Sequence, residues 1–306
     1  MREVEVQGVR LGAVGLGTWQ FGSFEWGYGD RYAGGEAATI VARALELGVN
    51  LFDSAEIYAF GRSERILGSA LGPNRSRAFI ATKVFPVLPL PAIVRWRAHA
   101  SARRLGVDAI DLYQVHWPSP LVPDATLMAG LRSLLEDGTI RHAGLSNYSV
   151  ERWRKSEQAL GRPLLSNQVP FSLAAPNAAA DQVPYAEAND RLVIAYSPLG
   201  QGFLAGTYSA GRRPPDRLRR INPRFSTGSL ERAKGLLAAL TEIAARHSAS
   251  AAQVALAWVI RHPNTVAIPG ARTVAQLEAN AAAADLELDG EEFQRLTRES
   301  AAYAGG

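Results

Sequence analysis

Short apolar runs alternate with longer segments of helical periodicity along nearly the whole chain, and this alternation constrains the fold more than any other feature. Eight apolar runs are predicted to form strands: Ala13–Gly17, Asn50–Phe52, Ala78–Thr82, Ala109–Val115, Ile140–Leu145, Leu164–Asn167, Leu192–Tyr196 and Thr265–Ile268. Strands that read as continuous apolar runs between helices are typical of a parallel sheet that is buried on both faces.

Helical periodicity occupies the segments between these runs. The predicted helices include Gly35–Leu47, Ser63–Leu71, Ala92–Leu105, Leu127–Glu136, Ser149–Leu160 and Ala251–Arg261, with a final helix near Glu291–Arg298. Ser63, Ser149 and Thr273 stand at the starts of helical stretches. We expect all three to be N-caps, because a hydroxyl oxygen can accept a hydrogen bond from a free N–H group of the first turn.

Eight strand–helix units without an intervening linker rich in Pro, Gly or Ser favour one (β/α)8 TIM barrel, a single domain over residues 1–306. A doubly wound sheet is the alternative, but it requires a G-x-G-x-x-G turn after the first strand, and Gly15–Trp19 lacks the third glycine. Two segments are additional to the eight strand–helix units of a minimal barrel. Met1–Arg10 is expected to form a β-hairpin that closes the bottom of the barrel, and Gly200–Ser229 to form a long loop after the seventh strand.

Composition excludes several kinds of site and of partner. The chain contains no cysteine, which excludes disulfides, thiolate metal sites and cysteine nucleophiles. Its net charge is only +4, and the basic residues are interspersed with acidic ones, so no nucleic-acid-binding surface is expected. The chain shows neither a signal peptide nor an apolar run that could span a membrane, and we expect a cytoplasmic protein.

Polar or ionisable side chains follow seven of the apolar runs, at the point where each strand is predicted to end. These residues are Asp53, Lys83, His116, Ser146 with Asn147, Gln168, Tyr196 with Ser197, and Arg272. The carboxyl ends of the strands in a (β/α)8 barrel meet at one rim, which carries the chemistry in such enzymes. The pattern therefore predicts a polar site at this rim.

Asp53, Tyr58, Lys83 and His116 form a combination with a specific chemistry. A tyrosine with a pKa of about 10 donates a proton effectively at neutral pH only if its phenolate form is stabilised. The ammonium of Lys83 would provide this stabilisation, and the carboxylate of Asp53 would hold the ammonium in place. His116 would orient a carbonyl oxygen toward the same proton. The other histidines fall in helical or polar segments, and no metal site is expected.

The motifs around these residues resemble the aldo-keto reductase superfamily. The matching segments run in order along the chain: LFDSAEIY ending at Tyr58, IATKV around Lys83, QVHWP around His116, GLSNY around Ser146, NQVPFS around Gln168, YSPLGQGFLAG from Tyr196, and IPGARTVAQLEAN from Ile268. The resemblance implies a barrel that binds NADP(H) across the rim and reduces an aldehyde or ketone, a small carbonyl substrate, to an alcohol.

The resemblance also implies a role for each matching residue. Tyr58 would be the general acid, with Lys83 and Asp53 lowering its pKa and His116 orienting the carbonyl. The implied cofactor contacts are Gly17, Thr18, Trp19, Asp53, Ser146, Asn147, Gln168, Tyr196, Ser197, Pro198, Leu199, Gly200, Gly202, Arg224, Gly270, Arg272, Gln276 and Asn280. The residues expected to line the substrate site are Trp19, Trp26, Tyr58, His116 and Trp117.

Within this set, Tyr196 would stack on the nicotinamide, and Ser146, Asn147 and Gln168 would bind its carboxamide. Arg224 would clasp the cofactor from the loop after the seventh strand, unless it belongs only to a solvated cluster of arginines. Arg272 would bind the 2′-phosphate of NADP, unless it pairs instead with Glu278. The chain departs from many relatives at Thr207, where they have a lysine, and after Arg298, where some have a long closing loop.

Two other functions stay open at this point. Some relatives of this fold are cofactor-sensing binding subunits with little turnover, although the presence of all four catalytic residue types favours an enzyme. Lys83 could instead form a Schiff base in a barrel lyase, but the IPGAR and YSPLGQG motifs would then have no purpose. The sequence identifies neither the carbonyl substrate nor the oligomeric state.

Overall fold

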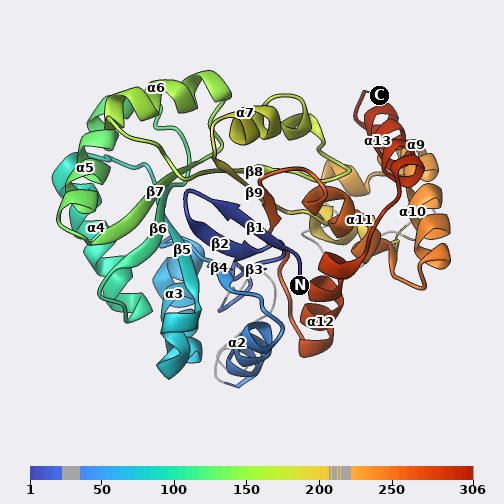
Figure 1. Ribbon diagram of the computed structural model, residues 1–306, viewed down its shortest axis with the longest axis horizontal. Coiled ribbons are helices and arrows are strands. Elements are labelled where there is room, and N and C mark those ends of the chain that lie inside the picture. The colour runs from blue at the N-terminus through green and yellow to red at the C-terminus, as the bar shows by residue number, and fades with distance from the viewer. Residues whose placement is uncertain (23–34, 207, 209–211, 213, 215–221, 306) are drawn as a thin grey trace.

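Eight parallel strands form one curled sheet in the computed structural model, which describes residues 1–22, 35–206, 208, 212, 214 and 222–305 (Figure 1). Each strand pairs with the next one along the chain. The strands are β3 (Leu16–Gly17), β4 (Leu51–Asp53), β5 (Phe79–Val84), β6 (Ile110–Val115), β7 (Ile140–Ser146), β8 (Ser166–Pro170), β9 (Leu192–Tyr196) and β10 (Thr265–Ala267). Every predicted apolar run overlaps one of these strands, and β4, β5, β7 and β8 extend beyond the carboxyl end of the predicted run.

The two ends of this sheet also meet, which closes the barrel. The N–H of Gly15 donates to the carbonyl of Ala267 at 2.8 Å, and the N–H of Gly17 donates to the carbonyl of Pro269 at 3.1 Å. A Cβ atom at position 17 would lie 2.9 Å from the carbonyl oxygen of Ile268, so this close approach requires glycine. The predicted (β/α)8 barrel is therefore confirmed.

Helices surround the strands (Figure 1). They are α2 (Glu36–Glu46), α3 (Arg62–Leu71), α4 (Pro91–Leu105), α5 (Asp124–Glu136), α6 (Val150–Leu160), α7 (Gln182–Ala188), α9 (Thr227–Arg232), α10 (Lys234–Arg246), α11 (Ala251–Ile260), α12 (Val274–Ala282) and α13 (Gly290–Gly305). Helix α10 packs against both α11 and α13. No helix in the described part of the chain is long and apolar enough to cross a membrane.

Two of the three predicted N-caps are confirmed. The hydroxyl of Ser149 accepts a hydrogen bond from the N–H of Arg152 at the start of α6, and Thr273 caps α12 in the same way. The prediction for Ser63 is wrong, because α3 starts one residue earlier and its N-cap is Gly61, which has a φ of 78°. Ser63 lies inside the helix and is buried, with its hydroxyl turned toward the barrel.

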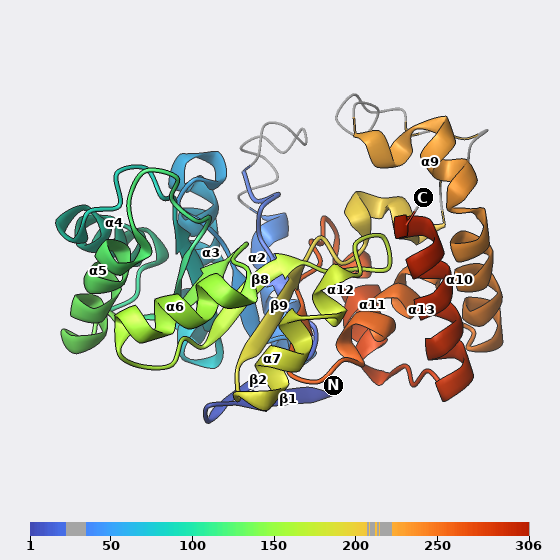
Figure 2. The ribbon, with the colours of Figure 1, turned by 90° about the horizontal axis from the view of Figure 1, so that it is seen from above.

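The N-terminal residues form the predicted hairpin, from β1 (Glu3–Val6) and β2 (Val9–Gly12). Val6 and Leu11 are buried in a cluster with barrel residues that include Leu51. The hairpin lies across the barrel at one end, as Figure 2 shows. It therefore covers the apolar interior there and leaves the carboxyl ends of the strands open.

The predicted loop Gly200–Ser229 follows β9, the seventh strand of the barrel; only part of it lies within the described residues, and its last three residues belong to α9. Its described part contains the short 3-10 turns η5 (Gly200–Ala205) and η6 (Pro223–Phe225). The ring of Phe225 packs against those of Phe203 and Tyr208, at centroid distances of 5.7 and 5.4 Å. These ring contacts attach the second turn of the loop to the first.

Candidate active site

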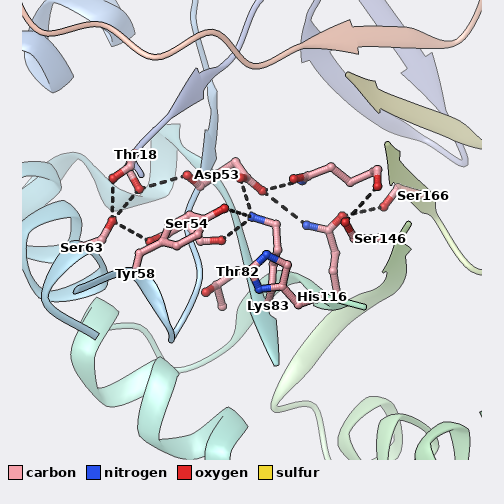
Figure 3. Close-up of polar contacts among 12 residues, drawn as sticks. Thr18, Asp53, Ser54, Tyr58, Ser63, Thr82, Lys83, His116, Ser146 and Ser166 are labelled. Atoms are coloured by element: carbon pink, nitrogen blue, oxygen red, sulfur yellow. Dashed lines mark hydrogen bonds and ion pairs between the residues drawn. The ribbon is translucent and has the colours of Figure 1, made fainter. Parts of the chain in front are cut away.

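Strands β4 and β5 place Asp53 and Lys83 side by side at the rim (Figure 3). The Nζ atom of Lys83 donates to Oδ1 of Asp53 at 2.6 Å and to the carbonyl oxygen of Ser54 at 2.7 Å. The two charged side chains are almost completely buried, with exposed fractions of 0% and 3%. Buried charges of opposite sign are stable only as a closely bonded pair, so each group fixes the position of the other.

The hydroxyl of Tyr58 lies 3.4 Å from Nζ of Lys83, and Figure 3 shows the phenol reaching toward this ammonium. Burial raises the pKa of Tyr58 above its usual value, Lys83 lowers it, and Asp53 raises it. The pKa of Tyr58 is thus raised overall, so the expected lowering is wrong; Asp53 adds to the rise because its negative charge disfavours a phenolate. Asp53 supports Tyr58 only by holding the ammonium in place.

Lys83 is a charged group here and not a free amine. Burial alone would lower the pKa of Lys83, but Asp53 and Tyr58 outweigh this effect and leave the pKa above its usual value. A protonated, fully buried amine with three hydrogen-bond partners is a poor nucleophile. The Schiff-base function that the sequence left open has no support in this geometry.

His116 follows β6, and its ring meets Tyr58 edge to face at a centroid distance of 5.8 Å. Burial and the charge of Lys83 lower the pKa of His116 to about 3, so the imidazole is neutral at physiological pH. Two partly exposed indoles flank these rings: Trp19 lies 6.4 Å from Tyr58, and Trp117 stacks on His116 at 6.5 Å. Trp26, expected in the same place, lies outside the described residues.

The side chains at the ends of β7, β8 and β9 form a hydrogen-bonded chain that leads to the ion pair. Gln168 donates from Nε2 to Oδ2 of Asp53 at 2.7 Å, and the hydroxyl of Ser146 donates to the carbonyl of Gln168 at 2.9 Å. Asn147 donates to the hydroxyl of Ser146 and accepts from the hydroxyl of Tyr196, each at 2.9 Å. These four predicted cofactor residues therefore occupy one continuous strip of the rim.

The turn after β9 continues this strip. Ser197, Gly200 and Gly202 all have positive φ angles, and the N–H of Gly200 donates to the carbonyl of Ser197 at 2.9 Å. Pro198 is buried, and Leu199 is half-buried. Burial raises the pKa of Tyr196, while the charge of Arg224 lowers it, so Arg224 acts electrostatically on the same rim.

At the next strand, Arg272 precedes the first turn of α12. Its backbone N–H donates to Oε1 of Gln276 at 2.9 Å, and Asn280 donates to the carbonyl of Gly270 at 3.4 Å. The guanidinium of Arg272 is exposed and forms no ion pair with any described residue. The alternative partner, Glu278, is bound instead to Arg43 at 2.8 Å.

Thr18 does not present its side chain to the rim. Its hydroxyl donates to the carbonyl of Asp53 at 3.0 Å and lies 2.8 Å from the hydroxyl of Ser63, while its N–H also binds the carbonyl of Asp53. Ser63 in turn lies 3.0 Å from the hydroxyl of Ser54. Thr18 and Ser63 thus support the backbone that carries Asp53, a role that the sequence did not predict.

Gln114 is a second supporting residue that the sequence analysis missed. It lies in β6, donates to Oδ2 of Asp53 at 3.4 Å and accepts from the hydroxyl of Ser166 at 3.3 Å. The available signal was that Gln114 is a polar residue inside the apolar run Ala109–Val115, directly before His116. Ser63 offered no comparable signal, because a serine in a first helical turn is common on structural grounds.

Comparisons with known proteins agree on one family. The chain matches the model of the Aldo/keto reductase family over residues 13–300. An uncharacterized oxidoreductase of Mycobacterium tuberculosis is 56% identical over 304 residues, which cover 99% of this chain and 94% of that protein. A methylglyoxal reductase of Escherichia coli is 33% identical over 300 residues, which cover 95% of this chain and 91% of that protein.

Solved structures show the same relationship. A glycerol dehydrogenase of Gluconobacter oxydans superposes with a TM-score of 0.89 at 31% identity, over 99% of this chain and 96% of that one. An aldo/keto reductase of Klebsiella pneumoniae, crystallised with NADP and acetate, has a TM-score of 0.78 at 30% identity, over 97% and 94% of the two chains. The sequence match extends over the whole barrel that carries the site, and the chain belongs to the aldo/keto reductase family of oxidoreductases.

Proposed function

We propose that this enzyme reduces an aldehyde or a ketone to the alcohol with NADPH, and that Tyr58 is the general acid. The observation that carries the proposal is the contact of the Tyr58 hydroxyl with a buried ammonium, 3.4 Å away, that is itself fixed by Asp53. This arrangement suits a group that must give up a proton at neutral pH and recover it afterwards.

The pKa values indicate how the proton would move. Because the pKa of Tyr58 lies above its usual value, the phenol is protonated and ready to donate. As negative charge develops on the carbonyl oxygen, Tyr58 transfers its proton, and the ammonium of Lys83 faces the phenolate that remains. Asp53 keeps that ammonium in place throughout, so little reorganisation is needed when the proton leaves.

His116 would orient the substrate. A neutral imidazole has one N–H donor and one acceptor, and the donor can bind the carbonyl oxygen on the side opposite Tyr58. The low pKa of His116 keeps it neutral, so it does not compete with Tyr58 as the acid. Trp19 and Trp117 would pack against the remainder of the substrate, since both indoles are partly exposed beside these rings.

The donor set at the rim fits a nicotinamide dinucleotide. Ser146, Asn147 and Gln168 supply hydroxyl and amide groups suited to a carboxamide, and the ring of Tyr196 lies beside them. Arg272, next to the positive end of α12, suits the 2′-phosphate that distinguishes NADP from NAD. The Klebsiella relative was crystallised with NADP, which supports NADP(H) as the cofactor. When bound, the cofactor supplies the hydride.

The test is the substitution Tyr58→Phe, which removes one hydroxyl and keeps the ring. NADPH oxidation would be followed by absorbance with a panel of carbonyl compounds that includes 4-nitrobenzaldehyde. General acid catalysis contributes about 10²- to 10⁴-fold, so kcat should fall by that factor while the Kd for NADPH stays the same. Tyr185→Phe is the matched control, because its hydroxyl is bound to Glu157 far from the rim. A Tyr58→Phe rate close to that of the wild type would contradict the assignment.

A cofactor-sensing subunit with little turnover is the alternative. The same assay separates the two functions, because both would bind NADPH and only the enzyme would reduce a carbonyl compound. Tight binding of NADPH without reduction of any compound in a broad panel would favour the sensing subunit. The intact arrangement of Tyr58, Lys83, Asp53 and His116 is the observation that favours the enzyme.

A further inference from the structure

Packing, and not hydrogen bonding, holds the ring of His116. Nδ1 of this imidazole is buried and has no hydrogen-bond partner in the described part of the chain. The ring instead touches three others: Tyr58 at 5.8 Å, Phe85 at 6.1 Å and Trp117 at 6.5 Å. Tyr58 is the proposed acid and Trp117 is partly exposed. Phe85, which meets His116 edge to face at 90°, is the third ring in contact with the imidazole.

Phe85 itself is held on both sides by one ion pair. Its N–H donates to Oε1 of Glu56 at 2.6 Å, and its carbonyl accepts from Nη1 of Arg97 at 2.7 Å. The same Nη1 donates to the carbonyl of Val87 at 3.2 Å. Arg97 also binds Glu56 through Nε at 3.0 Å and through Nη2 at 2.6 Å. The guanidinium thus bonds a carboxylate and two carbonyls at once.

This ion pair connects three separate segments of the barrel. Glu56 lies between β4 and Tyr58, Phe85 directly follows β5, and Arg97 lies in the middle of α4. The side chains of Glu56 and Arg97 are only 9% and 18% exposed, so water does not compete strongly for their bonds. A lysine could not replace the arginine here, because an ammonium lacks the planar fork that reaches several acceptors together.

We propose that Glu56 and Arg97 are positioning residues for the reaction: their ion pair fixes the backbone on both sides of Phe85, and the Phe85 ring fixes the imidazole of His116. The inference rests on the proposed role of His116 in orienting the carbonyl. It adds that this orientation depends on an ion pair that touches neither substrate nor cofactor. Loss of Arg97 would release the Phe85 carbonyl and leave Glu56 buried without its cation.

The kinetic test compares Arg97→Met and Arg97→Lys with the wild type. A displacement of about 1 Å in a reacting group can cost on the order of 100-fold in rate, so we expect kcat to fall at least about 10-fold in both variants. The Kd for NADPH should not change, because the pair lies away from the cofactor strip. Arg95→Met is the matched control, since Arg95 is on the same helix and pairs with Asp137, at the end of α5, at 3.3 Å.

A double-mutant cycle shows whether the effect passes through Phe85. Phe85→Ala removes the ring and keeps the two backbone bonds to the ion pair. If the pair acts through this ring, Arg97→Met should cause little further loss of kcat in the Phe85→Ala background, or in a His116→Gln background. Losses that multiply in both backgrounds would overturn the proposal and leave Arg97 with a general structural role.

A measurement without turnover separates this inference from the proposed function. With ¹³C-labelled histidine, the ring resonance of His116 can be assigned by its loss in His116→Gln. Arg97→Met or Arg97→Lys should shift that resonance, because the ring-current field of Phe85 changes with its position, and should leave the resonance of His142 unchanged. An unshifted His116 resonance would refute the inference whether or not the enzyme turns over. Absence of carbonyl reduction by the wild type would refute the proposed function instead.

Discussion

The ion pair of Lys83 and Asp53 should affect stability and catalysis separately, and substitutions can measure each effect. At 2.6 Å and an effective dielectric constant of about 20, the attraction between the two charges is about 6 kcal/mol. Moving two ions out of water costs several kcal/mol each, so the intact pair contributes little net stability. Removing only one partner leaves the other charge buried, which costs about 3–5 kcal/mol.

Lys83→Met should therefore lower the free energy of unfolding by about 3–5 kcal/mol. The double variant Asp53→Asn with Lys83→Met should be at least about 2 kcal/mol more stable than Lys83→Met alone, because no unpaired charge remains. The amide introduced by Asp53→Asn would keep an oxygen acceptor for Gln168, which now donates to Asp53 at 2.7 Å. Activity should not recover with stability, because neither variant has an ammonium beside Tyr58. We expect kcat to be lower by about 10²- to 10⁴-fold in both.

Urea unfolding followed by circular dichroism gives the free energies, and NADPH absorbance gives kcat. Asp111→Ala is a suitable control for a buried polar loss elsewhere in the barrel, since Asp111 lies near the amino end of β6 and is bonded there to Ile80 and Arg141. The reasoning would be refuted if Lys83→Met unfolded with the wild-type free energy. It would also be refuted if the double variant were less stable than Lys83→Met.

Three further perturbations test other parts of the structure. Because the pKa of His116 falls to about 3 on folding, the unfolded chain binds a proton that the folded one does not, and stability should drop by about 2 kcal/mol from pH 8 to pH 5. Urea unfolding should show a smaller drop in His116→Gln, and an equal drop would contradict the burial of a neutral ring. Arg272→Ala should weaken NADPH binding about 10- to 150-fold, the value of a charged hydrogen bond, with little effect on NADH binding. Tryptophan quenching measures both dissociation constants, and an equal loss of affinity for NADPH and NADH would show that Arg272 serves only the fold. Gly17→Ala should cost about 1–3 kcal/mol and lower the Tm, because its Cβ would lie 2.9 Å from the Ile268 carbonyl, and an unchanged Tm would contradict tight closure there.

Much of the barrel could be predicted because its strands are buried on both faces and read as apolar runs. Strand bounds differ where pairing is sparse: the run Ala13–Gly17 yields only the two residues of β3, and Val14 pairs across the closure with Ala267 as an isolated bridge. The residues at strand ends were predictable for the same reason. Parallel strands of a barrel place their carboxyl ends together, whatever the distance in sequence.

The supporting contacts of the site could not be predicted from local pattern. Ser63 looks like a helix cap in the sequence, but its hydroxyl bonds to Thr18, which is 45 residues away along the chain. The effect of Asp53 on the pKa of Tyr58 was also assigned the wrong sign. A carboxylate that holds a cation and a carboxylate that faces a phenol have opposite effects, and only the distances decide which is present.

The two halves of the proposed mechanism are therefore fixed in different ways. Lys83 and Asp53 are placed by adjacent strands whose register pairs Asp53 with Ala81, two residues before Lys83, and both strands can be recognised as apolar runs. His116 is placed by a ring whose backbone is held by Glu56 and Arg97, from a turn and a helix. No periodicity relates those two residues. The ammonium and its carboxylate should thus tolerate changes in the loops at the rim. Tyr58, which lies in the turn after β4, and the orientation of the carbonyl should be sensitive to such changes.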